Sequence, residues 1–565
     1  LVLECSSVGT YRVWICLLIM DPDDVIDYDG IGYIEEDHPL RPSMAAQSIA
    51  LLQVPSNRSR NVSVASSFTD QDVPIYPRER LYTPSRQRGL NGRLVFAIAA
   101  AAFGSSFQHG YNIGVVNSPQ KLIEEFIKSV MGNRSIEDGG DGYITDSSVT
   151  LVWATAVSIF CVGGMIGGAL TGVVANRFGR KGGLLLNNVF VFGAALSQGF
   201  SKSCNSYELI IFGRFLIGIN SGLNTGLAPM YLAEISPTHL RGAVGTVYQL
   251  VLTISILIAQ ILSLNSVMGT AELWPILLAA TVVPAIMMLA TLPLCPESPK
   301  YILFGQGKEL EAQRSLSWLR GTIEVQDEMD EMRGEYEQMK LLPTITMKEM
   351  FVNPSLRIPL VISMVIMVAQ QFSGINAAMF FSTSIFKLAQ LSDEGSQYAT
   401  LAMGAVNVFM TLVSLVLVEK AGRKTLLLVG FSGMFIVTIM LTFALNIAES
   451  SHSSLASNSC IILVILFVIL FAVGPGSIPW FLVNELFNQS ARPVASSIAV
   501  ATNWTANFFV GLGFLPLQVM MGGYVFLIFA VLQAIFSLFI YYKVPETKNK
   551  TIEEISSMFR QISYQ

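Results

Sequence analysis

The sequence contains few charged residues for its length. Asp, Glu, Lys and Arg make up 13% of the 565 residues, whereas 52% of the residues are hydrophobic. A water-soluble protein of this size cannot cover its surface with so few charges, but a lipid bilayer accepts apolar side chains on every side of a helix. The composition therefore excludes an ordinary soluble globule and predicts a membrane protein.

Several chemical features are also missing. The formal net charge is -5, so we expect no nucleic-acid partner. The six cysteines fall in unlike settings, and their spacing indicates neither a disulfide framework nor a metal site. Because the chain has no nucleotide-binding loop, zinc pattern or convincing catalytic triad, we predict no enzyme activity, no metal and no cofactor.

The first ninety or so residues differ from the rest. An apolar start is followed by an acidic stretch and a Ser/Arg/Pro-rich stretch with little apolar periodicity, a composition that is typical of disorder. The start lacks an initiator Met and a clear cleavage site, so a weak signal sequence, an extension of the gene model and a short anchor are all open. We favour the gene-model extension for residues 1 to about 43, and we predict 1–92 to be a disordered cytosolic extension.

From Leu94 onward, twelve apolar stretches are long enough to cross a bilayer, which takes about 20 helical residues. They lie near 94–114, 150–172, 182–201, 208–232, 243–265, 273–293, 357–386, 400–418, 425–446, 460–484, 495–518 and 522–542. A charged, helix-prone segment divides them six and six. We predict an all-α membrane protein with a first half at 93–295, a cytosolic helical linker at 296–350, a second half at 351–543 and a cytosolic tail at 544–565.

Lysine and arginine are unevenly distributed among the loops. The segments after spans two, four, six, eight, ten and twelve contain them, whereas those after spans five, nine and eleven have none. The positive-inside rule therefore places both termini and the linker in the cytosol. The acceptor sequon at Asn133 then falls in the first outside loop and is a candidate glycosylation site.

Short motifs recur in the same order in both halves. "GVVANRFGRK" matches "LVLVEKAGRK", "EISPTHLR" matches "ELFNQSAR", and "PESPK" matches "PETK", all at offsets of 243 to 251 residues. Three spaced matches in order indicate a duplicated, pseudo-symmetric transporter whose halves face each other.

The motifs "GRFLIG", "PMYLAEISPTHLRG", "PESPK", "QQFSGIN", "GPGSIPW", "NWTAN" and "PETK" also resemble those of a known family. Their order, over about 93–561, is similar to that of the facilitative glucose transporters in the sugar porter branch of the major facilitator superfamily. The resemblance implies uniport of a hexose, most simply D-glucose, through a pathway that opens alternately to each side. The hexose and the lipid bilayer would be the partners, and the plasma membrane is the default location.

A neutral sugar requires uncharged hydrogen-bonding groups, and amides within membrane helices are costly unless they face a cavity or each other. In span seven, Gln371 and Asn376 would point about 140° apart on an unbroken helix. A shared contact therefore requires a break near Ser373 and Gly374. The resemblance implies sugar contacts at Gln260, Gln370, Gln371, Asn376, Asn407 and Trp480.

Other polar residues in the spans have two interpretations. Asn503 in span eleven is added to the substrate-binding candidates, although for any single asparagine helix packing is an equally good interpretation. His109 in the first span is interpreted as lining the pathway. Phe380 and Phe381 stand where tyrosines are common in the family, and Ala472 stands where glucose-type relatives carry a glutamate. Glucose is favoured, and a glucose/fructose or fructose carrier is the alternative.

Energy coupling is predicted from one missing charge. Proton-coupled sugar symporters of this superfamily carry an aspartate in a "GYD" setting of the first span, near an arginine of span four. This chain has "GYN", with Asn112, and its first span contains no carboxylate. Because an amide cannot take up and release a proton at physiological pH, we predict a uniporter and a structural role for Arg214. A proton-coupled symporter and a non-transporting sugar sensor are the less favoured alternatives.

The "GPGSIPW" stretch places poor helix formers inside span ten. Pro475 and Pro479 each remove a backbone donor, and Gly474 and Gly476 allow bending. We predict a hinge here, with Trp480 offering its ring to the sugar, and a static kink is the alternative.

Charged residues recur at matching cytosolic helix ends in the two halves. We predict salt bridges between the halves that favour the outward-open state and break on opening inward, whereas solvated topogenic charge is the alternative. An exposed pair is worth only about 0.2 to 1 kcal/mol, so a network is required. Its predicted members are Arg177, Arg180, Lys181, Glu234, Arg241, Glu297, Glu419, Arg423, Lys424, Glu485 and Arg492.

Glycines recur every fourth residue in spans two and four. Such stripes allow helix backbones to approach closely in lipid. We predict close packing within the first half at Gly164, Gly168, Gly172, Gly218, Gly222 and Gly226.

Overall fold

The computed structural model describes residues 90–139, 141–237, 240–341, 345–451, 454–488, 490–548, 550 and 552–564. All of these residues belong to one unit, Pro84–Gln565. The predicted N-terminal extension lies almost wholly outside the described residues. Within these ranges the chain forms α-helices and short 3-10 helices and no strand, as predicted for an all-α membrane protein.

The six predicted spans of the first half all form helices. The sixth span is interrupted because Pro284 cannot donate a hydrogen bond to the carbonyl four residues earlier. A further helix, α3 (Gln120–Glu137), connects the first two spans. The spans are α2 (Gly92–Gly114), α4 (Asp146–Phe178), α5 (Arg180–Phe200), α6 (Glu208–Ile235), α7 (Arg241–Leu262) and the sequence α8 (Trp274–Ala279), α9 (Val282–Thr291) and η2 (Leu292–Leu294).

The second half repeats this arrangement with breaks in its seventh and tenth spans. The broken spans are α14 (Pro354–Phe372) with α15 (Ile375–Leu388), and α18 (Ser454–Val473) with α19 (Ile478–Leu486). The other spans are α16 (Asp393–Ala421), α17 (Arg423–Ser451), α20 (Arg492–Met521) and α21 (Val525–Lys543), with η3 (Gly522–Tyr524) between the last two.

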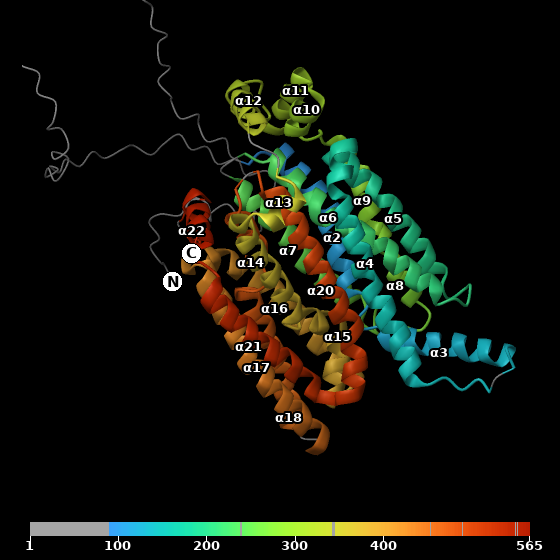
Figure 1. Cartoon of the computed structure of the whole chain (residues 1–565). Helices are drawn as coiled ribbons and strands as arrows, with labels where there is room; N and C mark the ends of the chain where they lie inside the picture. Colours follow the sequence, from blue (N-terminus) through green and yellow to red (C-terminus); the bar gives the residue numbers. More distant parts are fainter. Residues whose placement is uncertain are drawn as a thin grey trace, which may run out of the picture. The chain divides into compact units, whose positions relative to one another are not determined.

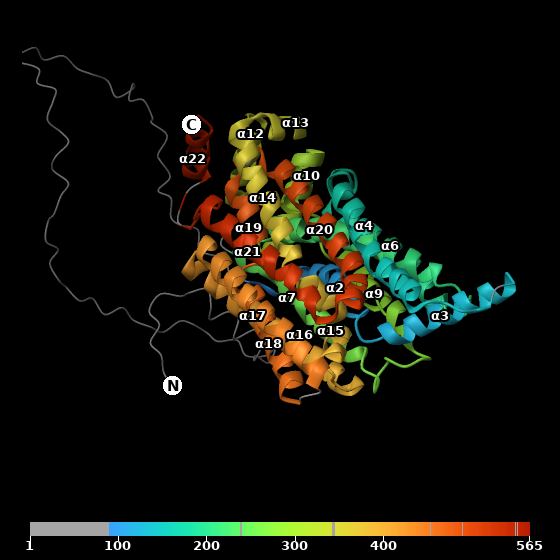
Figure 2. The ribbon, with the colours of Figure 1, turned by 60° about the horizontal axis from the view of Figure 1, so that its bottom comes forward.

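Helices outside the spans mark two ends of the protein. The linker contains α10 (Pro299–Gln306), α11 (Glu309–Arg320), α12 (Gln326–Leu341) and α13 (Met347–Val352), and α22 (Ile552–Tyr564) follows the last span. Figure 1 shows α10, α11 and α12 at one end of the membrane helices and α3 at the other, and Figure 2 shows the same helices after a turn. We call these the linker end and the far end.

Length and hydropathy support a membrane location. Eight helical segments among the described residues are long and apolar enough to cross a membrane, and one of them, Arg492–Lys543, covers two predicted spans. The remaining three predicted spans are α2, α6 and α16, which carry polar or charged side chains along their length. All twelve predicted spans therefore coincide with helices.

The glycine stripes pack in two directions. A Cβ on Gly218 would lie 2.2 Å from the carbonyl oxygen of Phe160, and one on Gly222 would lie 2.3 Å from that of Gly164, so α4 and α6 are in backbone contact. Gly164 and Gly168 also face α20 of the other half, with side-chain atoms of Trp504 and Val500 near their Cβ positions. The prediction of packing within the first half thus holds for the glycines of α6. It was wrong for Gly168, which packs across the two halves, and for Gly172, where a Cβ would meet no described atom within 4 Å.

Candidate functional site

The seventh span breaks between α14 and α15, as predicted. Gly374 connects the two helices with a backbone φ of 94°, a conformation that favours glycine. A Cβ there would lie 3.1 Å from Cγ of Phe529. The break frees the carbonyl of Ser373, which accepts a 2.7 Å hydrogen bond from Nε2 of Gln533 on α21. The conformation therefore favours glycine at this break, and a Cβ would crowd the ring of Phe529.

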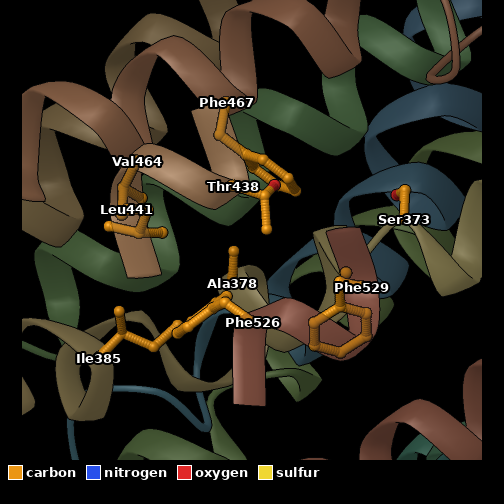
Figure 3. A pocket seen from close by; sticks show the side chains of 10 residues that line it. Ser373, Ala378, Ile385, Thr438, Leu441, Val464, Phe467, Phe526 and Phe529 are labelled. Atoms are coloured by element: carbon orange, nitrogen blue, oxygen red, sulfur yellow. The ribbon is translucent and has the colours of Figure 1, made fainter. Parts of the chain in front are cut away.

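A small cavity lies directly beside this break (Figure 3). Apolar side chains of α15, α17, α18 and α21 line it, and the side chain of Thr438 stands among them. The Thr438 hydroxyl is buried without a hydrogen-bond partner among the described residues. The helix that follows the glycine therefore has a loosely packed side.

The "GPGSIPW" stretch interrupts the tenth span between α18 and α19, as both the predicted hinge and the alternative static kink require. Gly474 touches α17, where a Cβ would lie 2.2 Å from the carbonyl oxygen of Leu426. Nε2 of Gln370 donates to the carbonyl oxygens of Pro475, at 2.9 Å, and Gly476, at 2.8 Å. A side chain from the end of α14 therefore binds the carbonyls that the second break frees.

Four of the predicted substrate-binding residues form one hydrogen-bonded cluster, which we call the amide cluster: Gln370, Gln371, Asn376 and Asn503. Nε2 of Gln371 donates to Oδ1 of Asn503 at 2.9 Å, and Nδ2 of Asn503 donates to Oε1 of Gln370 at 2.8 Å. Asn376 donates to Oε1 of Gln371, across the break in span seven. Uncharged donors and acceptors from α14, α15 and α20 thus meet where the two broken helices adjoin.

The other three predicted sugar contacts lie outside the amide cluster. Trp480 is half-buried on α19 and packs beside Met367 and Ala499. Asn407 is buried on α16. Gln260 is 1% exposed, and its amide atoms have no hydrogen-bond partner among the described residues. Its Oε1 is close to Gly404 of α16, so Gln260 lies where α7 meets the other half.

The two phenylalanines that replace family tyrosines are buried. The rings of Phe380 and Phe381 lie 6.1 Å apart, and the ring of Phe381 stacks on Phe514 at 5.6 Å. Ala472 is buried as well. In this arrangement the two aromatic substitutions add apolar packing.

A second group of amides, in the first half, was not among the predicted site residues. Nε2 of Gln108 donates to Oδ1 of Asn188 at 2.9 Å, and Nδ2 of Asn187 donates to Oδ1 of Asn224 at 2.9 Å. Asn224 also donates to Gln108 at 3.3 Å. These buried amides join α2, α5 and α6 to one another. Amides within spans one, three and four were the available signal. Here they bond to one another, although Oδ1 of Asn187 has no hydrogen-bond partner among the described residues.

Arg214 is a buried cation with few partners. Its side chain is 1% exposed on α6, Nη1 donates to the backbone oxygen of Asn112 at 2.9 Å, and the guanidinium lies 4.7 Å from the centre of the Phe160 ring. Nε and Nη2 have no hydrogen-bond partner among the described residues. These contacts agree with the predicted structural role of Arg214.

The halves are joined by polar contacts at the far end. Asn117, just after α2, donates to Ser382 and accepts a 3.0 Å hydrogen bond from the backbone of Thr383, both on α15. Nε2 of Gln397 on α16 donates to Oδ1 of Asn265, after α7, at 2.8 Å. These bonds close the seam between the halves at this end.

An ion pair adds to this closure at the far end. Nζ of Lys121 lies 3.8 Å from Asp393, which also pairs with Lys387 at 2.9 Å. Nearer the linker end, a Cβ on Gly172 or Gly245 would meet no atom of another described segment within 4 Å. The polar contacts described between the halves therefore lie at the far end.

In the first half, the repeated charged motif caps a helix. Gly179 has a φ of 82° and offers no side chain to the start of α5. Glu297 instead accepts hydrogen bonds from the backbone N–H groups of Arg180, at 3.1 Å, and Lys181, at 3.0 Å. A carboxylate here satisfies donors that a helix start leaves unpaired and suits the positive end of the helix dipole. The side chain of Arg180 pairs with Glu234 at 2.9 Å.

The second half repeats this geometry. Gly422 has a φ of 91°, and Glu546 accepts from the backbone N–H groups of Arg423, at 2.8 Å, and Lys424, at 3.1 Å. The side chain of Arg423 pairs with Glu485 at 2.8 Å. Glu546 was missing from the predicted network, although the match of "PETK" to "PESPK" was a signal for it.

The predicted salt bridges between the halves are not what these residues form here. The pairs of Arg180 with Glu234 and of Arg423 with Glu485 each lie within one half. Glu297 of the linker and Glu546 of the tail each cap a helix of the half that precedes them. Arg177 is exposed, and Nη2 of Arg492 donates to the backbone oxygen of Phe487 at 3.3 Å. The side chains of Arg241 and Glu419 lie outside the described residues. A structure closed at the far end is the state in which the sequence predicts such bridges to be broken.

Comparison with known proteins extends the resemblance. A family model described as "Sugar (and other) transporter" matches residues 97–559. Facilitated glucose transporter member 1 of solute carrier family 2 from Gallus gallus is 45% identical over 472 residues, covering 84% of this chain and 94% of that protein. Member 4 from Mus musculus is 46% identical over 478 residues, covering 84% and 92%.

Solved structures share the fold. The inward-open conformation of the xylose transporter XylE from E. coli superposes with a TM-score of 0.68 at 24% identity, covering 82% of this chain and 99% of that one. A partially occluded inward-open conformation of the same transporter gives a TM-score of 0.66 at 23% identity. The chain therefore belongs to the sugar (and other) transporter family and has its fold, twelve membrane helices in two six-helix halves.

Proposed function

We propose that the chain carries a hexose, most simply D-glucose, across a membrane by facilitated diffusion. The amide cluster carries this proposal, because it gathers uncharged donors and acceptors at the meeting point of two broken helices. Amides suit a neutral, polyhydroxylated solute, whereas an ionic substrate requires charge. Relatives named as facilitated glucose transporters, at 45% identity and above, support the same substrate class.

The cycle that we propose is alternating access. The halves rock about the substrate, the breaks at Gly374 and "GPGSIPW" act as hinges, and the linker at 296–350 serves as a latch between the halves. Trp480, Asn407 and Gln260 complete the sugar path as the halves move. The charged network at the linker end, Glu546 included, re-pairs between the halves when that end closes.

We propose uniport because the first span has no carboxylate that could carry the coupling proton. Asn112 stands where a coupling carboxylate would be required, and Arg214 contacts its backbone and pairs with no acid among the described residues. In vesicles, an inward proton gradient is expected to leave the rate and the final level of hexose uptake unchanged. Faster uptake, or accumulation above the outside concentration, would contradict uniport.

The linker end is proposed to be cytosolic, with both chain termini on that side, and the plasma membrane is the proposed location. Lysine and arginine in the loops support this orientation. Asn133 is exposed on α3 at the far end, so we expect it to carry a glycan. Replacing Asn133 with glutamine should remove a shift in electrophoretic mobility that a glycosidase also removes, and an unchanged mobility in both tests would refute the assignment.

Uptake of radiolabelled hexose in a cell that lacks its own carriers tests the main proposal. Saturable glucose uptake is expected, reduced at least tenfold by Gln371→Ala and by Trp480→Ala at equal surface expression. Inhibition of glucose uptake by fructose tests whether fructose is also a substrate. The buried Phe380 and Ala472 do not decide between the two sugars. Surface expression without saturable hexose flux would refute the proposal.

A further inference from the structure

One aromatic side chain of the second half is buried in the core of the first. Trp504 on α20 is 5% exposed, and the other buried members of its hydrophobic cluster, which include Phe160 and Ile217, all belong to the first half. Phe160 meets the indole edge-on at 5.8 Å. Gly164 makes room for the ring, since a Cβ there would lie 2.6 Å from an indole carbon. The contact leaves no space for the indole to shift toward α4.

His109 of the first half also packs against the indole of Trp504. The imidazole is 8% exposed on α2, and its centre lies 5.9 Å from the Trp504 ring, tilted by 34°. Nδ1 of His109 lies 3.1 Å from the hydroxyl oxygen of Tyr248 on α7. A hydrogen bond at this length restricts rotation of the imidazole about its side-chain bonds. The ring that meets the tryptophan is therefore held from behind by another helix of the same half.

We propose that His109 stabilises the arrangement closed at the far end by holding Trp504 across the seam, and that Tyr248 is the positioning residue for His109. When the far end opens, the two halves must tilt relative to each other. The imidazole of His109 and Gly164 are both fixed in the first half, so the indole of Trp504 cannot keep both contacts when it moves with the second half. A contact made in only one arrangement shifts the balance between the two. This inference rests on the proposed transport cycle, because it requires two arrangements of the halves.

The expected size of the effect follows from the contact. An aromatic pair of this geometry changes an equilibrium constant by roughly two- to thirteenfold. Removing the ring of His109 should therefore raise the ratio of far-end-open to far-end-closed molecules by a factor in that range. Removing only the Tyr248 hydroxyl should raise it less, because the imidazole remains but is no longer held.

Spin-label distances across the far end measure this ratio directly. Cys204 is exposed on the first half and Ser450 is exposed on the second, so labels on Cys204 and on a Ser450→Cys substitution report the opening. Cys5 and Cys16 are replaced by serine, and the other cysteines are buried. Double electron–electron resonance is recorded on the full chain in lipid nanodiscs without sugar.

Three variants are compared with the parent: His109→Leu, Tyr248→Phe and the double variant. If Tyr248 acts through His109, the double variant matches His109→Leu. Phe103→Leu, at a lipid-exposed position of the same helix, is the matched control and should leave the ratio unchanged. An unchanged ratio in His109→Leu, or a double variant that shows the product of the two single effects, would overturn the proposal.

The spin-label distances are measured without substrate. The proposal for transport and the proposal for His109 can therefore be refuted independently. Absence of hexose uptake by the parent chain would refute the transport proposal while leaving a measured shift intact. Normal hexose uptake with no shift in His109→Leu would refute the role of His109 alone. If His109→Leu fails to reach the membrane, Tyr248→Phe and His109→Phe provide the measurement, because each retains both rings. At least one of them must raise the ratio of far-end-open to far-end-closed molecules. An unchanged ratio in both variants would overturn the proposal.

Discussion

Replacing Gln370 with leucine tests whether the amide that joins the two helix breaks stabilises the second half. Leucine has a similar volume but cannot donate to the carbonyls of Pro475 and Gly476 or accept from Asn503. A buried polar group that loses its partner costs about 1 to 3 kcal/mol. Three such groups, with some relaxation of the glycine-rich segment, are expected to lower the free energy of unfolding by roughly 2 to 4 kcal/mol.

Gln260→Leu is the matched control for this experiment. It changes another buried glutamine of a membrane helix, but one whose amide atoms have no partner among the described residues. The same substitution there removes two unsatisfied polar atoms and should be neutral or stabilising. In a half of this size, 1 kcal/mol corresponds to about 2 to 4 °C in Tm. Thermal unfolding in detergent should therefore place Gln370→Leu roughly 5 to 15 °C below the parent and Gln260→Leu no lower.

Two outcomes would refute this reasoning. Equal melting temperatures for Gln370→Leu and the parent would mean that the bonds to the break contribute little. A larger loss in Gln260→Leu would mean that its amide has a structural partner. Hexose uptake by both variants separates stability from recognition, because loss of uptake by a stable Gln260→Leu protein would support the predicted sugar contact.

Three further predictions follow from the seam and the helix caps. Gly164→Ala places a Cβ against the indole of Trp504, so we expect hexose uptake to fall at least tenfold and to recover partly in the double variant with Trp504→Leu; no recovery would contradict the steric account. Lys387 and Lys121, which pair with Asp393, hold the pKa of this carboxyl below its usual value. The contribution of Asp393 to far-end closure is therefore fully present when the pH is above the usual pKa. It is lost only when the pH falls through the lowered pKa. Asp393→Asn should accordingly raise the far-end-open population at pH 7, while lowering the pH of the parent from about 7.5 to 5.5 should not; an opening of the parent in that interval would contradict this. Glu297→Gln and Glu546→Gln each weaken a helix cap with the same geometry, and each should lower Tm by a few degrees, about 1 to 2 kcal/mol; strongly unequal losses would show that the duplicated caps differ in strength.

The fold follows from patterns that are local in the sequence. Apolar runs of membrane length, prolines and glycines inside two of them, and repeated motifs at fixed offsets suffice for twelve spans in two halves. The break at Gly374 was predictable because Gln371 and Asn376 can meet only if the helix is interrupted. Such inferences require only the geometry of a single helix.

Contacts between helices were less accessible to sequence reasoning. A glutamine in a membrane helix looks the same whether it joins a cluster, as Gln371 does, or lies against the other half, as Gln260 does. Likewise, the charged motifs suggested pairing between the halves because they recur, yet the recurrence reflects two equivalent helix caps. Which face of a helix meets which neighbour depends on tertiary packing, and the sequence periodicity of an all-round apolar helix does not encode it.

The amide cluster has a consequence for the return of the empty carrier. Both amide hydrogens of Gln370 are donated to backbone carbonyls, and its oxygen accepts from Asn503 and, at 3.4 Å, from Gln371. A sugar hydroxyl can bind there only by exchanging places with a protein partner. Without sugar, the groups of the amide cluster satisfy one another. A uniporter must complete the substrate-free half of its cycle without a bound sugar. Because the amide cluster is hydrogen-bonded within itself when empty, it adds no cost of unpaired polar groups to that step.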